Sequence, residues 1–329
     1  MKKYKLLFCF LFIFITTPIL AADRDFSSFV EYLPQGKIDW DNGYFYGIGR
    51  GFPHLNQGSR ARALRVAQAE ALSSILKVAS GLRMDDSNTL AQLRQKKVII
   101  QLKGLVLYEP YERTFKERGD EPCVEVTYRA KMTGVKGLTS RFLEQVKGKT
   151  TSWNKFPKPK SPFFEDPSMP WLLLDARGLE NQGSVKPAVF PEVISEKGEP
   201  VYELSNVNEE ALVKRGMARY VVSGKSREEL LSSSNMLRFA RVMRILSVPS
   251  VEAAEKKRRK RRETYIISDA KEATGLMKTN LVISERDAKR LKQEDAASQI
   301  LSQCRVMVIV SESLGGIEGE RLQFLALNR

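Results

Sequence analysis

The most regular hydrophobic pattern in the chain lies between residues 60 and 82. Apolar residues recur there three or four positions apart, at Leu64, Ala67, Ala71, Ile75, Val78 and Leu82. This spacing places them on one face of an α-helix. Ser59 is a typical N-cap residue and Gly81 marks the expected end, so the pattern predicts a helix over residues 60–82. The many alanines of this segment favour close packing against a sheet.

Stretches rich in apolar and β-branched residues on either side of this helix predict two antiparallel hairpins. The first joins residues 37–40 to residues 44–48 through Asp41-Asn42-Gly43, a sequence that favours a turn with positive φ. The second joins residues 98–108 to residues 123–132 through a charged turn.

Two shorter segments predict helices over residues 88–96 and 138–146 and complete a first unit over residues 36–148. The order of its elements is typical of a small α+β sandwich. Residues 149–170 are then rich in Lys, Pro, Ser and Thr, which predicts an extended linker. The linker also carries the aromatic residues Trp153, Phe156, Phe163 and Phe164. Part of it is therefore expected to pack along a domain surface.

A second unit is predicted over residues 171–314. Its strand candidates are residues 171–176, 189–194, 201–202 and 306–310, with a turn at residues 196–198. The last candidate is a continuous apolar run, as expected of a strand buried on both faces. Asn208, followed by two acidic residues, predicts a short helix that Gly216 ends. Ser284 begins a capping-box sequence and a helix that extends to about residue 301.

The N-terminal segment has the order of a secretory signal peptide. Three lysines precede an apolar run over residues 6–15, and small residues end the segment at Ala21-Ala22. The run is about half the length of a membrane-spanning helix. No cysteine follows the small residues, so no lipid anchor is expected. We expect cleavage near Ala22 and a periplasmic α+β protein, peripheral at most to the outer membrane, with two small α/β sandwich domains joined by the Pro/Lys-rich linker.

The positive charge of the chain is concentrated in one place. The formal net charge is +15, and it is +12 once the three signal-peptide lysines are removed. Seven of these charges form an uninterrupted basic run: Lys256, Lys257, Arg258, Arg259, Lys260, Arg261 and Arg262. In an exported protein such a run can bind anionic lipid, lipopolysaccharide or an acidic partner, whereas nucleic acid is disfavoured because no stacking aromatic accompanies it. A solvated loop without a partner is the alternative, and both interpretations stay open.

Few residues have the pattern of an enzyme site. The single histidine, His54, has no ligand-spaced partner for a metal, and no cofactor is expected. The most enzyme-like group is Asp175-Ala176-Arg177-Gly178, although an ion pair that stabilises a turn is the favoured interpretation. Cys123 and Cys304 remain in the mature chain, and two separate buried thiols are favoured over a disulfide bridge.

A strand and helix near the N-terminus resemble a known module. Residues 44–51 read YFYGIGRG, with Gly47 and Gly49 in a Gly-x-Gly, and the Ala-rich segment at residues 60–81 follows. This order is similar to the N-terminal domain of the flagellar assembly protein FlgT, to the flagellar lipoprotein FlgP and to the related twenty-kilodalton outer-membrane lipoprotein family. The glycines lack the spacing of a dinucleotide site and are expected to form a tight connection between strand and helix.

A second segment looks like a pattern of exported proteins from the same neighbourhood. It reads D-A-R-G-L at residues 175–179, P-A-x-x-P at residues 187–191 and E-x-G-x-x-V-Y at residues 196–202. The resemblance implies a non-enzymatic structural or adaptor protein of the envelope, with a flagellar basal-body ring or disk as its most concrete form. Its partners would be further copies of the chain or other envelope and flagellar proteins. The alternatives are a periplasmic polyanion-binding protein that acts through the basic run and, third, an unrecognised hydrolase.

Overall fold

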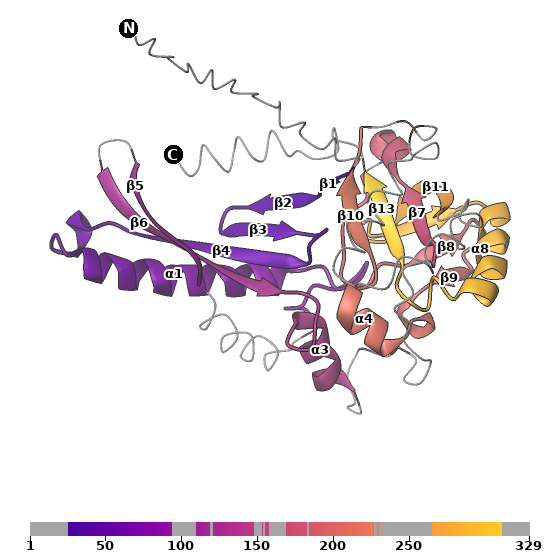
Figure 1. Cartoon of the computed structure of the whole chain (residues 1–329), viewed down its shortest axis with the longest axis horizontal. Coiled ribbons are helices and arrows are strands. Elements are labelled where there is room, and N and C mark those ends of the chain that lie inside the picture. The colour runs from indigo at the N-terminus through magenta and orange to yellow at the C-terminus, as the bar shows by residue number, and fades with distance from the viewer. Residues whose placement is uncertain are drawn as a thin grey trace, which may run out of the picture.

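The computed structural model of the chain describes residues 26–93, 110–118, 121–147, 153, 155–157, 169–182, 184–224, 226, 229 and 265–310. The protein is α+β, as predicted, and its described strands form one sheet of five strands and one of eight. The two sheets lie end to end, with the long helix α1 (Arg60–Gly81) along the first and α8 (Glu285–Ser298) at the far end of the second (Figure 1). The predicted signal peptide, the basic run and most of the linker lie outside the described residues.

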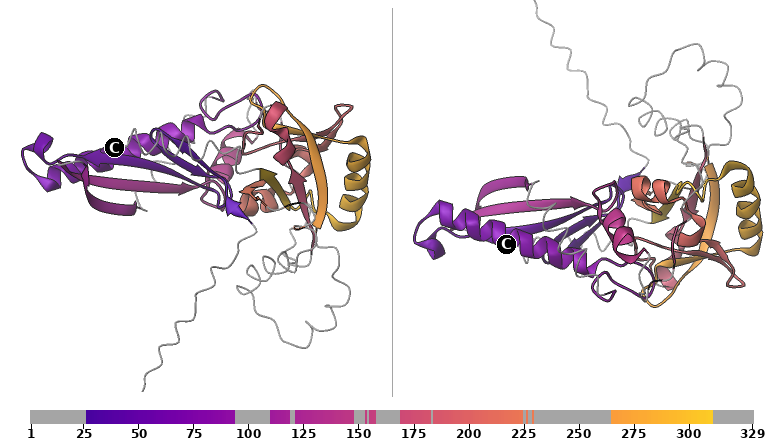
Figure 2. Two further views of the ribbon diagram at one scale, coloured as in Figure 1. Left: turned by 90° about the horizontal axis from the view of Figure 1, so that it is seen from above. Right: turned by 90° about the horizontal axis from the view of Figure 1, so that it is seen from below.

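The five-stranded sheet is antiparallel throughout. In spatial order its strands are β2 (Val30–Leu33), β3 (Gly36–Asp39), β4 (Tyr44–Gly51), β6 (Glu121–Lys131) and β5 (Pro110–Arg118). The first predicted hairpin is confirmed, because β3 pairs with β4 and Gly43 adopts a φ of 67° in the turn. Helix α1 runs along one face of this sheet, as Figure 2 shows from two sides.

Helix α1 begins where the sequence predicts. The Ser59 hydroxyl accepts a hydrogen bond from the backbone N–H of Arg62 at 3.3 Å. The helix ends at Gly81, one residue before the predicted end, and Leu82 follows it into the core. The buried face is made of small and apolar residues: Ala63, Ala67, Ala71, Ser74, Ile75, Val78 and Ala79. The predicted face is therefore confirmed, although Leu64 is only partly buried.

Glycines of β4 allow α1 to approach the sheet to backbone contact. A Cβ atom on Gly49 would lie 2.2 Å from the carbonyl oxygen of Ala67 and equally close to the amide nitrogen of Ala71. Gly47 and Gly51 meet the helix in the same way. We expected these glycines to form a tight connection between strand and helix, and this expectation is wrong, because they lie within β4 and pack against the side of α1. Alternate residues of a strand share one face, so the three glycines leave the face of β4 under the helix without side chains.

The second hairpin differs from its prediction in one strand. β6 forms as predicted, but its described partner is β5, whereas residues 98–108 lie outside the described residues. Hydrophobic patterning missed β5 because its sequence, PYERTFKER, is mostly polar. Residues 88–93, predicted to begin a helix, form a turn in which Thr89 pairs with Arg83. Helix α3 (Leu138–Val146) has the predicted bounds.

The eight-stranded sheet is mixed. In spatial order its strands are β1 (Ser27–Ser28), β10 (Arg219–Val222), β13 (Val306–Val310), β7 (Trp171–Asp175), β11 (Tyr265–Thr274), β12 (Asn280–Ile283), β8 (Val193–Ser195) and β9 (Pro200–Tyr202). The central strands β10, β13, β7 and β11 run parallel. All five residues of β13 are buried, which confirms the prediction of a strand covered on both faces.

Several strands of this sheet differ from the prediction. The predicted strand over residues 189–194 is wrong in extent, since β8 contains only Val193–Ser195. Pro187 and Pro191 lie just before it, and proline cannot donate to a strand ladder. The sequence analysis also missed the strands β10, β11 and β12.

The helix caps of the second unit are as predicted. Asn208 accepts a hydrogen bond from the N–H of Ala211 at 2.9 Å and opens helix α4 (Glu209–Arg215), which Gly216 ends with a φ of 77°. Ser284 accepts from the N–H of Asp287 at 3.0 Å and opens α8, which stops at Ser298 rather than near residue 301.

The two sheets share one hydrophobic core. A single cluster of buried residues extends from Phe45 under α1 to Val308 in β13. The chain also crosses between the sheets at Phe29, because β1 pairs with β10 while β2 pairs with β3. In the described part of the chain, no helix combines the length and apolarity needed to cross a bilayer.

Candidate functional site

The predicted site residues Asp175 and Arg177 form an ion pair at the end of β7. The Arg177 Nε donates to Asp175 Oδ1 at 2.8 Å, and the backbone N–H of Arg177 donates to the same oxygen at 3.2 Å. The side chains of Asp175 and Arg177 are only 13% and 17% exposed, respectively. Gly178 follows in the 3-10 helix η2 (Arg177–Gln182) with open space around it. This geometry fits the favoured interpretation, because the carboxylate is occupied in closing the strand-to-η2 turn.

The remaining predicted candidates are dispersed. The basic run from Lys256 to Arg262 lies outside the described residues, so its binding role stays a prediction. His54 is exposed, beside Phe52 at a ring distance of 5.8 Å. Within the described residues, no group of His, Cys, Asp and Glu side chains is arranged to hold a metal ion. Cys123 and Cys304 are both buried as free thiols, as favoured by the sequence analysis.

Two arginines join the five-stranded sheet to the second unit. Arg83 follows α1, and its guanidinium pairs with Glu31 of β2 while its Nε donates to the carbonyl of Pro187 at 2.7 Å. Arg219 of β10 donates from Nε and Nη2 to Asp41 of the first hairpin at 3.0 and 2.7 Å. Glu31 and Asp41 are thus paired with arginines that also contact or belong to the second unit.

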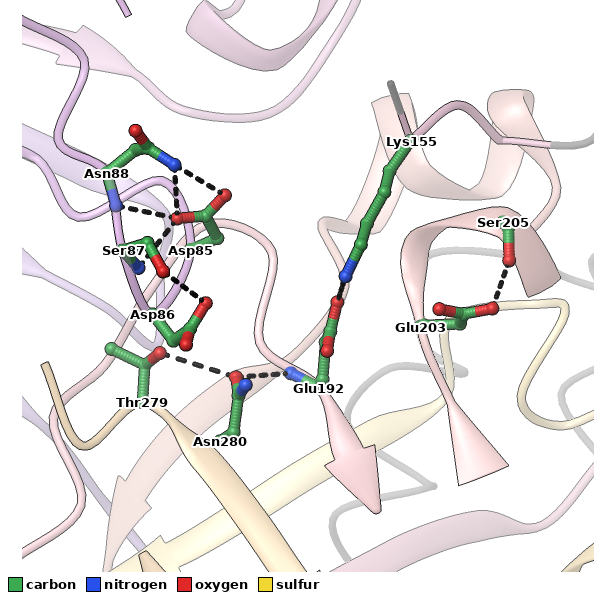
Figure 3. Close-up of polar contacts among 10 residues, drawn as sticks. All are labelled: Asp85, Asp86, Ser87, Asn88, Lys155, Glu192, Glu203, Ser205, Thr279 and Asn280. Atoms are coloured by element: carbon green, nitrogen blue, oxygen red, sulfur yellow. Dashed lines mark hydrogen bonds and ion pairs between the residues drawn. The ribbon is translucent and has the colours of Figure 1, made fainter. Parts of the chain in front are cut away.

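An ion pair holds the start of the linker against the second unit, beside a cluster of acidic residues (Figure 3). Lys155 pairs with Glu192, whose backbone N–H donates to Asn280 Oδ1 at 3.1 Å. Burial lowers the pKa of Lys155, but the hydrogen bond to Glu192 and the negative charges of Glu192, Glu203 and Asp85 raise it by more, so the net pKa lies above its ordinary value. The lysine therefore stays charged and ties the linker to Glu192.

The linker is also held by an aromatic contact. Trp153 is buried between Phe142 of α3 and Phe190 of the second unit, with ring centroids 5.2 and 5.4 Å away. The expected packing of the linker along a surface is thus observed at Trp153, and it bridges the two units rather than covering one of them.

A second kind of polar site lies on the sheet face away from α1. Cross-strand pairing sets Lys37 opposite Tyr46, Tyr46 opposite Arg129, and Tyr44 opposite Lys131. Lys37 Nζ lies 4.9 Å from the Tyr46 ring centroid, and the Arg129 guanidinium lies 5.1 Å from that of Tyr44. Lys131 Nζ lies 5.6 Å from the Tyr44 centroid. We call these five residues the tyrosine–cation surface.

The tyrosine–cation surface ends in a hollow of about 370 Å³. The hollow lies at the loop between β6 and α3, whose positions Figure 1 shows. Its described lining is Arg129, Ala130, Lys131, Thr133, Gly134, Val135, Lys136 and Gly137, with three cations and no carboxylate. Sequence reasoning missed this site. The alternation Tyr44-x-Tyr46 and Arg129-x-Lys131 was visible, but only strand pairing shows that the two segments are adjacent.

The comparisons with known proteins concern the second unit. Residues 171–312 match the family model described as Treponema pallidum Tp0624, second domain. The match begins at the first residue of β7 and covers the eight-stranded sheet except for β1. It takes in less than half of the chain. No curated protein matches the chain.

Proposed function

We propose that this protein is a non-enzymatic structural or adaptor protein of the bacterial periplasm and envelope. The observation that carries the proposal is that charged side chains form structural ion pairs where the two units and the linker meet. Arg83 and Arg219 connect the two units, Lys155 ties the linker to the second unit, and the enzyme-like Asp175–Arg177 pair closes a turn. A rigid body of this kind holds its outer surfaces at fixed positions, which is what an adaptor needs.

The most concrete form of the proposal is a component of a flagellar basal-body ring or disk. Its support is the resemblance of residues 44–51 and 60–81 to the FlgT and FlgP module. The sheets also end in described edge strands, β2 and β5 on one and β1 and β9 on the other, and strand edges can pair side by side in a homo-oligomer.

Deletion of the gene tests this function. Loss of motility with an intact envelope supports the flagellar form, and cross-linking in living cells should then recover the chain with itself or with basal-body proteins. Intact-mass measurement of the exported protein should give a start near Asp23 without a lipid adduct. A strain with normal motility and no cross-linked envelope partner would contradict the adaptor role.

A periplasmic polyanion-binding protein is the second candidate, favoured by the seven consecutive cations at residues 256–262. Each cation near an anionic membrane contributes about 1 kcal/mol, so the run could hold the protein at a surface without a lipid anchor. Replacement of all seven by Ser and Gln should leave thermal melting unchanged and abolish low-salt association with envelope membranes. Association that survives the replacement would identify the run as a solvated loop.

A further inference from the structure

We propose that the hollow at the end of β6 binds the phosphate groups of an anionic lipid surface, with Val135 touching the lipid. The proposal rests on the envelope location in the proposed function, but it uses a site separate from the basic run. It assigns membrane contact to the five-stranded sheet, in the half of the chain that the family match does not cover.

The hollow is lined by positive charge. Arg129, Lys131 and Lys136 line it, and its described lining contains no carboxylate. Lys131 and Lys136 are exposed, and neither forms an ion pair with a carboxylate of the described residues. Lys131 and Lys136 line the same hollow and repel each other, and an anion bound between them lowers that cost.

These cations are held in position before any ligand arrives. Arg129 and Lys131 both lie over the Tyr44 ring, at 5.1 and 5.6 Å. The loop that carries Lys136 is fixed as well, because the N–H of Gly134 donates to the carbonyl of Val213 in α4 at 2.6 Å. Gly134 has a φ of 91°, a conformation that favours glycine. A positioned set of donors loses little entropy when it binds.

The surface is better suited to phosphate headgroups than to nucleic acid or to a single carboxylate. The Tyr44 ring is engaged by cations, so the surface presents charge rather than a free ring on which nucleic-acid bases would stack. A single carboxylate carries one charge against three cations, whereas a bilayer surface supplies several phosphates at once.

An exposed apolar side chain lies beside these charges. Val135 is 76% exposed and lies directly before Lys136 in the loop. An exposed valine next to a lysine suits a membrane interface, where the apolar group enters the headgroup region and the cation meets the phosphates. An acidic protein surface would accept the lysines but would leave the valine without an apolar contact.

Vesicle binding by the full mature protein tests the site. The vesicles contain phosphatidylglycerol mixed with phosphatidylcholine, or phosphatidylcholine alone, and binding is measured by co-sedimentation at low and high salt. The test variant is Lys131→Gln/Lys136→Gln. The matched control is Lys77→Gln/Lys289→Gln, which removes the same charge from exposed positions in α1 and α8. All variants are also made with the basic run neutralised, so that the two sites are read separately.

The test pair should weaken binding to phosphatidylglycerol vesicles about thirty-fold, since each cation near an anionic surface contributes about fivefold. The control pair should change it less than about threefold, and melting should be unchanged in both. Val135→Ser should weaken binding with little change in its salt dependence. Equal losses from both pairs would show diffuse charge attraction and overturn the site. Binding of inorganic phosphate without vesicle binding, or no binding at all, would overturn the lipid assignment while leaving the adaptor function standing.

Discussion

Arg83 donates to Glu31 through its guanidinium, at 3.0 Å from Nη1 to Oε1, and to the Pro187 carbonyl through Nε. The same carboxylate accepts from the Trp40 indole at 2.9 Å. One arginine thus connects the end of α1, the edge of the five-stranded sheet and the second unit. Both charged side chains are 18% exposed, so water screens the pair weakly.

Replacement of Arg83 by Ala should destabilise the whole described body. Glu31 would lose its cation while partly buried, at a cost of about 2–3 kcal/mol. Urea unfolding should show one transition at a lower midpoint, because the two sheets share a core. The control is Lys292→Ala, which breaks a pair with Glu199 on an exposed face and should cost less than about 0.5 kcal/mol. Equal effects of the two variants would contradict the joining role of Arg83.

Gly49→Ala should disrupt the packing of α1 on the sheet. The added Cβ would lie 2.2 Å from backbone atoms of the helix, which cannot move aside as a side chain can. We expect a loss of about 3 kcal/mol or a failure to fold, measured by thermal melting and circular dichroism. Gly178→Ala is the control, since no atom lies within 4 Å of its added Cβ, and it should change stability by less than about 0.5 kcal/mol. A stable Gly49→Ala protein would show that the helix can lift from the sheet.

Trp153→Ala should release the start of the linker. The change removes a buried indole between Phe142 and Phe190 and should cost about 3 kcal/mol. Limited trypsin digestion should then cleave after Lys155 much earlier than in the unchanged protein. Phe156→Ala removes a partly buried ring nearby and serves as a milder comparison. Unchanged cleavage would mean that Lys155 and Glu192 hold the linker without the tryptophan.

The protein should lose stability in alkaline solution. Burial raises the pKa of the Cys304 thiol to about 12, and it also raises the pKa of the neighbouring Tyr202 hydroxyl. The folded state therefore holds protons that the unfolded state releases above the ordinary thiol pKa of 9.0. This contribution is complete below that value and is lost as the pH rises toward 12.

Melting temperatures measured from neutral pH upward should fall in this window, and Cys304 should resist iodoacetamide until the protein unfolds. Cys304→Ala should make the alkaline fall shallower, even if it lowers stability at neutral pH. Rapid alkylation of Cys304 in the folded protein would contradict its burial.

Local signals in the sequence determined much of the secondary structure. Ser59, Asn208 and Ser284 predicted helix starts because each cap depends on one side chain and the next few backbone amides. The apolar run of β13 predicted a doubly covered strand for a similar reason, since burial on both faces leaves a continuous hydrophobic stretch.

Only the tertiary structure determined which elements pack against one another. The sequence around the glycines of β4 did not indicate that α1 packs directly on them. The polar strand β5 is specified by its pairing with β6 rather than by its own hydrophobic pattern. The hollow joins residues of β6 to the loop before α3, and its aromatic support, Tyr44, comes from β4. Sequence spacing describes contacts within about one helical turn or one hairpin. Contacts between distant segments depend on strand order and packing, which the whole chain determines together.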